Sequence, residues 1–338
     1  MPLLEVKNLV THFKIRAGWV RAVDDVSLVL NEGETLGLVG ESGCGKTTLG
    51  YTITQLLPNN AYVIGGEVNF NGRDLIAISR KKSGRLDDYH PEITKIRWAE
   101  ISMIFQGAMN AFNPVYKIGD QIIEAIRVHS DVDYDTAMKR VEELFKFIGI
   151  PLDRIDNYPH EYSGGMKQRA MIAMALALNP KLIIADEPTT ALDVIMQRKI
   201  LKEIMKLQDD FKMSMIIISH DVSVVAEIAD QIAVMYAGKM VEKGTANQIF
   251  KETSHPYTAA LLGAFPSITG PKKRLATIPG NPPSLVNPPK GCRFHPRCSV
   301  AKPLCAEQEP PMVEVSPGHT SLCHYANEFS AKRKGAKK

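Results

Sequence analysis

The stretch Gly40-Glu41-Ser42-Gly43-Cys44-Gly45-Lys46-Thr47 fits the pattern G-x-x-x-x-G-K-[ST] of a phosphate-binding loop. Thr35–Val39, just before the loop, predicts a strand, and a helix is expected to begin near Gly45. Glycines let backbone N–H groups close around phosphate oxygens, and the helix N-terminus adds partial positive charge. The sequence therefore predicts a strand, a loop and a helix that together bind a nucleotide.

The side chains of this loop have separate expected roles. Lys46 can reach the β- and γ-phosphates, and Thr47 can offer its hydroxyl to Mg²⁺. Cys44 stands at a variable position and is interpreted as a small spacer. The alternative is a glycine-rich turn with a chance Lys-Thr pair, which the flanking strand and helix disfavour. The residues expected to contact the nucleotide here are Gly40, Glu41, Ser42, Gly43, Cys44, Gly45, Lys46, Thr47 and Thr48.

A second candidate element is an apolar strand that ends in two acids. Leu182–Ala185 is followed directly by Asp186 and Glu187. Such a strand buries its stem and presents the acids at the carboxyl edge of the sheet, where ligands bind. We expect Asp186 to hold Mg²⁺ through water and Glu187 to polarise the attacking water. Adjacent acids at a strand end are common, so this interpretation depends on the phosphate loop upstream.

The order of predicted elements indicates an α/β protein with a largely parallel sheet. Residues 115–178 are predicted to be helical, because their isoleucines, leucines and valines repeat at helical spacing. Strands are predicted before and after this helical region, at Leu4–Leu9, Val26–Leu30, Thr35–Val39, Glu67–Phe70, Leu182–Ala185, Met215–Ile218 and Ile232–Tyr236.

Bulk composition is that of an ordinary globular protein. The chain has 338 residues, 44% hydrophobic residues and a formal net charge of +4, which indicates neither nucleic-acid binding nor its absence. No apolar run approaches the roughly 20 residues that span a bilayer, and no signal peptide is evident. We therefore expect a cytoplasmic protein whose five cysteines are not a disulfide framework.

The composition changes after about residue 255, where prolines become frequent and four of the five cysteines follow. We predict a nucleotide-binding domain at 1–255, a proline-rich linker at 256–290, a cysteine module at 291–330 and a solvated basic tail at 331–338. Cys292, Cys298, Cys305 and Cys323 leave gaps of five, six and seventeen residues. Four thiols in so short a segment suggest one tetrathiolate site, because no core there is large enough to order it.

The identity of the expected group stays open on spacing alone. Zinc sites usually show paired C-x₂₋₄-C knuckles, which these gaps do not provide. An iron–sulfur cluster also takes four thiolates and tolerates varied spacing. The alternatives are therefore [4Fe–4S], Zn²⁺ and no metal. His295, His319 and His324 are expected to be solvated or close to the site rather than ligands.

Further segments resemble the ATP-binding cassette (ABC) family. Ser163-Gly164-Gly165-Met166-Lys167-Gln168-Arg169 resembles the ABC signature, with Met166 where glutamine is commoner. Gln106 resembles the Q-loop, Ala191-Leu192-Asp193 the D-loop and His220 the switch histidine. With the phosphate loop these motifs stand in family order over roughly residues 1–250.

The resemblance implies a P-loop ABC ATPase cassette with a RecA-like core, an antiparallel β subdomain, a helical subdomain near 115–178 and a small C-terminal cysteine-bearing extension. It implies catalytic roles for Glu187, His220 and Gln106, with Gln106 also near Mg²⁺. Such cassettes pair head to tail, so that each signature closes on the partner's ATP. Ser163, Gly164, Gly165 and Asp193 are then nucleotide contacts. Phe13 occupies the family's adenine-stacking position, and Trp19 is the competitor.

The resemblance narrows further to the ATPase subunits of oligopeptide, dipeptide and nickel importers, as the first of their two paired ATPases. It is carried by Tyr158-Pro159-His160-Glu161, by Asp186–Val194 and by His255-Pro256-Tyr257-Thr258. After Gln106, Gly107-Ala108 departs from the Asp-Pro that is frequent in that group, in a region that the resemblance places at the membrane partner. The tail Gly291–Cys298 resembles one that binds [4Fe–4S], which makes this cluster the preferred alternative.

The resemblance to that group implies a peripheral protein on the cytoplasmic face of the membrane. Its implied partners are a second ABC ATPase, two permeases and, indirectly, an extracytoplasmic substrate-binding protein. Peptides are the preferred substrate, with oligosaccharides second. The other class considered is an ABC ATPase that acts on DNA or ribosomes. The chain lacks the second cassette, long coiled coil and strongly basic face expected there, so no nucleic-acid partner is predicted.

Overall fold

The structure is a computed structural model that describes residues 2–107, 111–188, 197, 201–202, 204–206, 208, 210, 212–264 and 278–336. It divides into two compact units. The helical unit comprises Asn31–Glu34 and Asp88–Ile218, and the phosphate-loop unit comprises Pro2–Leu30, Thr35–Asp87 and Ser219–Lys338. None of the helices in these described ranges is both long and apolar enough to cross a bilayer.

The phosphate-loop unit begins with a sheet of alternating buried and exposed residues. Its strand order is β2-β1-β4-β5, with bounds β1 (Pro2–Ile15), β2 (Gly18–Asn31), β4 (Ala61–Phe70) and β5 (Arg73–Asp74). β1 runs antiparallel to β4, with Leu4 opposite Phe70 and both side chains fully buried. The predicted strands at residues 4–9, 26–30 and 67–70 lie inside β1, β2 and β4.

A second sheet of this unit carries the phosphate loop. Its order is β3-β9-β10-β12-β11, with bounds β3 (Thr35–Val39), β9 (Gln231–Tyr236), β10 (Lys239–Thr245), β12 (His319–Leu322) and β11 (Met312–Ser316). β3 is buried along its whole length and runs parallel to β9. The helices of the unit are α1 (Lys46–Thr54), α2 (Leu75–Ser79), α8 (Val222–Ile228), α9 (Ala246–Glu252), α10 (Pro256–Gly263), α11 (Pro303–Glu307) and α12 (Ala326–Ala336), with the 3₁₀ turn η4 (His295–Arg297).

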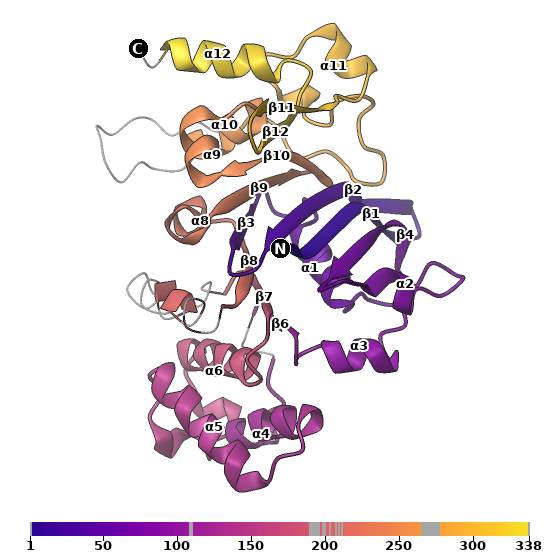
Figure 1. The fold of residues 1–338 in the computed structure, drawn as a ribbon. Coiled ribbons are helices and arrows are strands. Elements are labelled where there is room, and N and C mark those ends of the chain that lie inside the picture. Colours follow the sequence, from indigo (N-terminus) through magenta and orange to yellow (C-terminus); the bar gives the residue numbers. More distant parts are fainter. Residues whose placement is uncertain are drawn as a thin grey trace. The chain divides into compact units, whose positions relative to one another are not determined.

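The C-terminal segment is built into this second sheet. β12 pairs antiparallel with β10 through Ser321 opposite Glu242, and β11 pairs with β12. In Figure 1 the orange and yellow elements β10, β11, β12, α9 and α10 accordingly lie together. The helix α10 occupies the start of the segment predicted as linker. The predicted partition at residues 255, 290 and 330 remains a prediction, but the C-terminal strands share their sheet with the nucleotide-binding part.

The helical unit combines a short parallel sheet with a helix bundle. β6 (Ile101–Ile104), β7 (Leu182–Asp186) and β8 (Ser214–Ser219) are buried and parallel. Its described helices include α3 (Pro91–Ile96), α4 (Ile118–His129), α5 (Tyr134–Phe147) and α6 (Gly164–Leu176), with the 3₁₀ turns η2 (Leu152–Arg154) and η3 (Pro159–Glu161). Within this unit α4, α5 and α6 pack together (Figure 1). The predicted helical region at 115–178 thus contains α4, α5 and α6, and the isoleucine stripe of α4 is its buried face.

Candidate nucleotide-binding site

The phosphate loop lies between β3 and α1 in a shape that requires glycine at two positions. Gly40 has φ +152°, and a Cβ there would meet the Met235 carbonyl oxygen at 2.2 Å. Gly45 has φ +109° and would place a Cβ 2.0 Å from the Ala22 carbonyl oxygen. Both backbone positions exclude a side chain for two independent reasons, positive φ and close backbone approach. The loop is therefore packed tightly against neighbouring backbone at both ends.

Lys46 points back into this loop. Its Nζ donates to the carbonyl oxygens of Gly40 at 2.8 Å and Glu41 at 3.0 Å. It also lies 3.7 Å from Cys44 Sγ, whose pKa is raised by burial. Lys46 is only 7% exposed. A buried ammonium inside a ring of backbone groups is an arrangement that binds phosphate, because its positive charge has no carboxylate beside it in the described contacts.

The acidic strand places its two carboxyl groups differently. Asp186, the last residue of β7, is 1% exposed. Glu187 has φ +49°, and its N–H donates to the Ile218 carbonyl at 2.9 Å. Gln106 Nε2 donates to Glu187 Oε2 at 2.8 Å. The structure thus brings Gln106 and Glu187 together, although they lie 81 residues apart in sequence.

The signature segment caps a helix. Ser163 is the N-cap of α6, and its hydroxyl accepts from the Met166 N–H at 3.3 Å. Gly164 and Gly165 form the first turn, where unpaired N–H groups favour an anion. Further along α6, Gln168 Nε2 donates to the Pro188 carbonyl at 2.6 Å. This bond ties the signature helix to the segment that follows Glu187.

Three further predicted residues of the site remain to be placed or lie outside the described residues. Asp193, in the predicted D-loop, is outside the described residues. His220 follows β8, is exposed and belongs to the phosphate-loop unit. Phe13 is half-buried in β1 opposite Ala61, so its adenine-stacking role remains a prediction. The competitor Trp19 packs edge-on against Tyr62, with ring centroids 5.2 Å apart.

The four C-terminal cysteines line one cavity. Cys292, Cys298, Cys305 and Cys323 surround it together with Phe294, His295, His324 and Tyr325. It contains about 410 Å³ of space free of atoms, part of it open to solvent. All five cysteines of the chain are thiols in this structure. Segments that lie up to 31 residues apart in the tail therefore converge on a shared, mainly apolar space.

The four thiols are spread around the wall of the cavity and do not converge on a single point. Burial raises the pKa of Cys292 and of Cys323 to about 11, so these thiols are neutral near pH 7. Across the part of the chain that the structure describes, no three His, Cys, Asp or Glu side chains are grouped closely enough to hold a single metal ion. The donor set fits a group that takes each thiolate at a different position.

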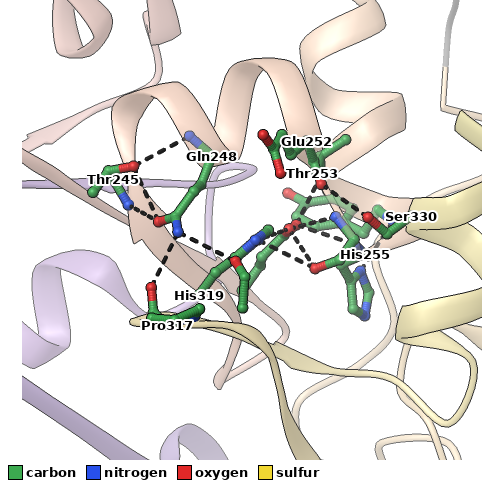
Figure 2. A network of polar contacts seen from close by, with 12 residues as sticks. Thr245, Gln248, Glu252, Thr253, His255, Pro317, His319 and Ser330 are labelled. Atoms are coloured by element: carbon green, nitrogen blue, oxygen red, sulfur yellow. Dashed lines mark hydrogen bonds and ion pairs between the residues drawn. The ribbon is translucent and has the colours of Figure 1, made fainter. Parts of the chain in front are cut away.

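A buried polar network, not anticipated from the sequence, anchors the C-terminal strands beside this cavity. Glu242 in β10 is fully buried and accepts hydrogen bonds from Thr253, from Ser254 and from the His255 N–H. Its carboxylate also lies 2.8 Å from Nε2 of His319, the first residue of β12. His319 (labelled in Figure 2), expected to be solvated or near the cluster, is therefore buried, with its Nε2 beside the Glu242 carboxylate.

Neighbouring contacts extend this network to the end of the chain. Gln248 Nε2 donates to the Pro317 carbonyl at 3.2 Å, and Ser330 Oγ donates to the Glu252 carbonyl at 3.5 Å (Figure 2). Burial opposes ionisation of Glu242, but hydrogen bonds from His319 and the Ser254 N–H outweigh it and lower the pKa of this carboxyl below its usual value. The carboxylate thus stays charged inside the unit and joins β10 to β12.

Comparisons with known proteins agree with this geometry. The sequence profile of the ABC transporter family matches residues 23–190, and that of the oligopeptide/dipeptide transporter C-terminal region matches residues 241–305. The chain is 47% identical to the oligopeptide transport ATP-binding protein OppD of Bacillus subtilis, over 94% of this chain and 87% of that protein. It is 44% identical to the dipeptide transport ATP-binding protein DppD of Escherichia coli, over 96% and 97%.

Solved cassettes have the same fold. The dimeric ATP-binding cassette MJ0796, in a post-hydrolysis state bound to ADP and Pi, aligns with a TM-score of 0.63 at 27% identity, over 72% of this chain and 98% of that one. CbiO1 of Clostridium perfringens, part of the complex cbiONQ, aligns with a TM-score of 0.60 at 25% identity, over 74% and 91%. The phosphate loop, the acidic strand and the capped signature helix are therefore those of an ABC ATPase, and the chain belongs to the ABC transporter ATP-binding subunits that carry the oligopeptide/dipeptide C-terminal region.

Proposed function

We propose that this chain hydrolyses ATP to energise the uptake of oligopeptides or dipeptides through a pair of membrane permeases, as a peripheral protein on the cytoplasmic face of the membrane. The observation that carries the substrate class is the C-terminal match at residues 241–305, together with the peptide-transport names of relatives that align over nearly their whole length. Oligosaccharides are the second candidate. A substrate-binding protein outside the membrane would deliver the substrate to the permeases.

Reconstitution of the complete complex in liposomes tests the proposed substrate. ATP-dependent accumulation of a labelled tripeptide, and none of a labelled oligosaccharide, is expected. The reverse preference would replace the peptide assignment. Co-purification of the chain with DNA instead of with permeases would reject the transport assignment altogether.

The nucleotide chemistry is divided among groups whose roles are proposed residue by residue. Lys46 and the N–H groups of residues 40–48 bind the phosphates, and Thr47 and Asp186 hold Mg²⁺ with Gln106 close by. Mg²⁺, when bound, neutralises charge on the phosphate oxygens. Glu187 accepts a hydrogen bond from Gln106, which fixes the carboxylate that orients and deprotonates water. His220 and Asp193 are proposed to complete the site, with Phe13 on adenine.

The signature helix is proposed to serve a second subunit. Ser163, Gly164 and Gly165 offer an anion site at the N-terminus of α6. A head-to-tail pair would let each signature close on the partner's ATP. We propose that the partner is a related second ABC ATPase, and that this chain is the first member of the pair.

The cysteine cavity is proposed to hold one [4Fe–4S] cluster with a structural role. Cys292, Cys298, Cys305 and Cys323 would each bind one iron, which matches four thiols placed around a shared volume. When bound, the cluster supplies a covalent cross-link between distant parts of the tail. The thiols must lose their protons to bind, so their raised pKa makes cluster assembly release protons.

Anaerobic purification tests the cluster. A brown protein that absorbs near 400 nm, with about four irons and four sulfides per chain, is expected. Cys298→Ser should bleach the protein, whereas Cys44→Ser, a buried thiol outside the cavity, should keep the colour. A colourless preparation with one Zn²⁺ per chain would favour zinc and leave the four-cysteine site in place.

A further inference from the structure

An arginine of the cysteine module reaches the phosphate loop. Arg297 ends the turn η4 and directly precedes Cys298. Its Nη1 donates to Glu41 Oε2 at 2.6 Å, and its Nη2 donates to Glu41 Oε1 at 2.9 Å. This is a bidentate pair between residues 256 positions apart, and the arginine side chain is only 6% exposed. Such a fork fixes both the distance and the orientation of the two groups.

The arginine itself is held by several contacts. Its Nε donates to the Pro279 carbonyl at 2.9 Å, and Nη1 lies 3.3 Å from the Tyr236 hydroxyl. The guanidinium also lies over the Tyr236 ring, 5.8 Å from its centroid. The position of the guanidinium is thus determined by the tail and by β9, and not by the phosphate loop alone.

A second contact reaches the same loop residue through its backbone. The Glu41 N–H donates to the Tyr257 hydroxyl at 2.8 Å. Tyr257 lies in α10, is fully buried, and packs on Tyr236 and Phe294 with ring centroids 4.5 and 5.3 Å away. Glu41 is therefore held at its carboxylate and at its peptide by residues that follow position 255.

This residue stands next to the cation of the loop. The Glu41 carbonyl accepts from Lys46 Nζ at 3.0 Å, beside the bond from Lys46 to Gly40. Movement of Glu41 would shift the carbonyl groups to which Lys46 donates its hydrogen bonds. Binding is stronger when a loop is already in its bound shape, because less ordering remains to be done.

We propose that Arg297 is a positioning residue for ATP: through Glu41 it lets the cysteine module hold the phosphate loop in the shape that receives the nucleotide. The turn that carries Arg297 is bounded by two of the cavity cysteines. The His295 N–H donates to the Cys292 carbonyl at 3.0 Å, and the Cys298 N–H donates to the His295 carbonyl at 3.2 Å. Loosening these cysteines would move Arg297 and weaken nucleotide binding.

Equilibrium binding of a fluorescent ATP analogue to the purified full-length chain tests the proposal. Arg297→Met removes the charge and the fork but keeps much of the bulk, and should raise Kd about tenfold, the effect of losing a charge-assisted hydrogen bond. Lys302→Met is the matched control. It breaks an ion pair of the same module, Lys302 Nζ to Glu328 Oε2 at 2.8 Å, away from the loop. Its Kd should stay within twofold of the wild type.

A double-mutant cycle separates positioning from general loosening of the tail. If Arg297 acts through Glu41, adding Arg297→Met to Glu41→Gln should change Kd less than twofold. A merely structural role would give additive effects and the same loss in both backgrounds. If Arg297→Met does not fold, Arg297→Lys, which keeps the charge without the fork, takes its place and should raise Kd by several-fold.

The inference rests on the proposed role of the phosphate loop in ATP binding. A third variant distinguishes failure of the Arg297 proposal from failure of that proposed role. Lys46→Ala should abolish tight binding of the same analogue. If Lys46→Ala weakens binding but Arg297→Met stays within twofold of the wild type, or its effect persists with Glu41→Gln, the positioning role is overturned and the nucleotide site stands. If Lys46→Ala binds normally, the proposed site fails first.

Discussion

The residues proposed for the nucleotide site lie in different surroundings, and we predict that they serve different steps. Lys46 is enclosed by the carbonyl oxygens of its own loop, whereas Glu187 faces Gln106 in the other unit. A phosphate ligand would compete with loop carbonyls for the ammonium. The carboxylate instead meets a neutral amide that can orient it without removing its charge. Mutations should therefore be able to impair ATP binding and ATP hydrolysis independently of each other.

Glu187→Gln is expected to retain ATP binding and to lose steady turnover by about 10²–10⁴-fold, the usual contribution of a positioned general base. The substitution removes the proton acceptor and leaves the phosphate loop unchanged. Phosphate release by the assembled complex measures the turnover, and Lys46→Ala serves as the contrasting variant that should weaken binding itself. Wild-type turnover by Glu187→Gln would contradict the catalytic assignment.

Gly45→Ala tests the close backbone approach in the phosphate loop. The new Cβ would lie 2.0 Å from the Ala22 carbonyl oxygen at φ +109°, so β2 or the loop must shift. We expect a loss of about 1–3 kcal/mol in the free energy of unfolding, with impaired ATP binding. Gly33→Ala is the control, because Gly33 also has positive φ, +71°, but a Cβ there meets nothing within 4 Å. Equal losses in urea unfolding would show that φ, not the contact, matters.

At the scale of elements, the join between β10 and β12 depends on a buried charge. Glu242 is fully buried and His319 is 1% exposed. Removing one partner of a buried hydrogen-bonded pair leaves polar groups of the other unsatisfied, at a cost of about 1–3 kcal/mol. Glu242→Gln should lower the free energy of unfolding by this amount. Glu328→Gln, which breaks exposed pairs with Lys302 and Lys332, should leave the free energy of unfolding nearly unchanged, because water screens those pairs.

His255, the N-cap of α10, is expected to make the stability of the protein depend on pH. His255 Nδ1 accepts from the Tyr257 N–H, and burial lowers the pKa of His255 to about 4. In the unfolded chain the pKa is about 6.5, so below that pH the unfolded state takes up the proton first. The neutral His255 side chain therefore makes its full contribution to stability above pH 6.5, and this contribution is lost as the pH falls towards 4.

His255→Asn keeps an N-cap acceptor and removes this titration. Between pH 8 and pH 5 the wild type should lose about 2 kcal/mol more than the variant, at about 1.4 kcal/mol per pH unit below 6.5. Urea unfolding at the two pH values measures the difference. Parallel losses in both proteins would assign the acid sensitivity to other groups.

At the scale of the whole molecule, the signature helix predicts dependence on a partner. Ser163 caps the N-terminus of this helix, and the anion site proposed there would bind only nucleotide that is held by another subunit. The chain alone should therefore be mainly monomeric and hydrolyse ATP slowly. Size measurements on Glu187→Gln with ATP and Mg²⁺, with and without the second ATPase, check this. Tight, fully active homodimers would contradict a heterodimeric design.

Local motifs were enough to predict much of the site, because each one is contiguous in sequence. The phosphate loop from Gly40 to Thr47, the acids that end β7 and the Ser163 cap each depend on spacing within a few residues. Strands with clear alternation or continuous apolar runs, such as β3, were found for the same reason. β12 was missed, because its only apolar signal is Leu322 and its burial comes from pairing with β10.

The family could be recognised from the sequence, and the nucleotide chemistry and the cluster cysteines could be predicted from it, since all of these depend on residue types at short spacings. The tertiary structure was needed to show that the C-terminal segment packs with the phosphate loop. Arg297 and Glu41 are 256 residues apart, and Glu242 and His319 are 77 apart. No periodicity or spacing pairs such residues, because long-range contacts arise from how the sheet and the tail pack. The sequence suggested a tail joined by a linker, whereas the folded chain places that tail against its ATP-binding loop.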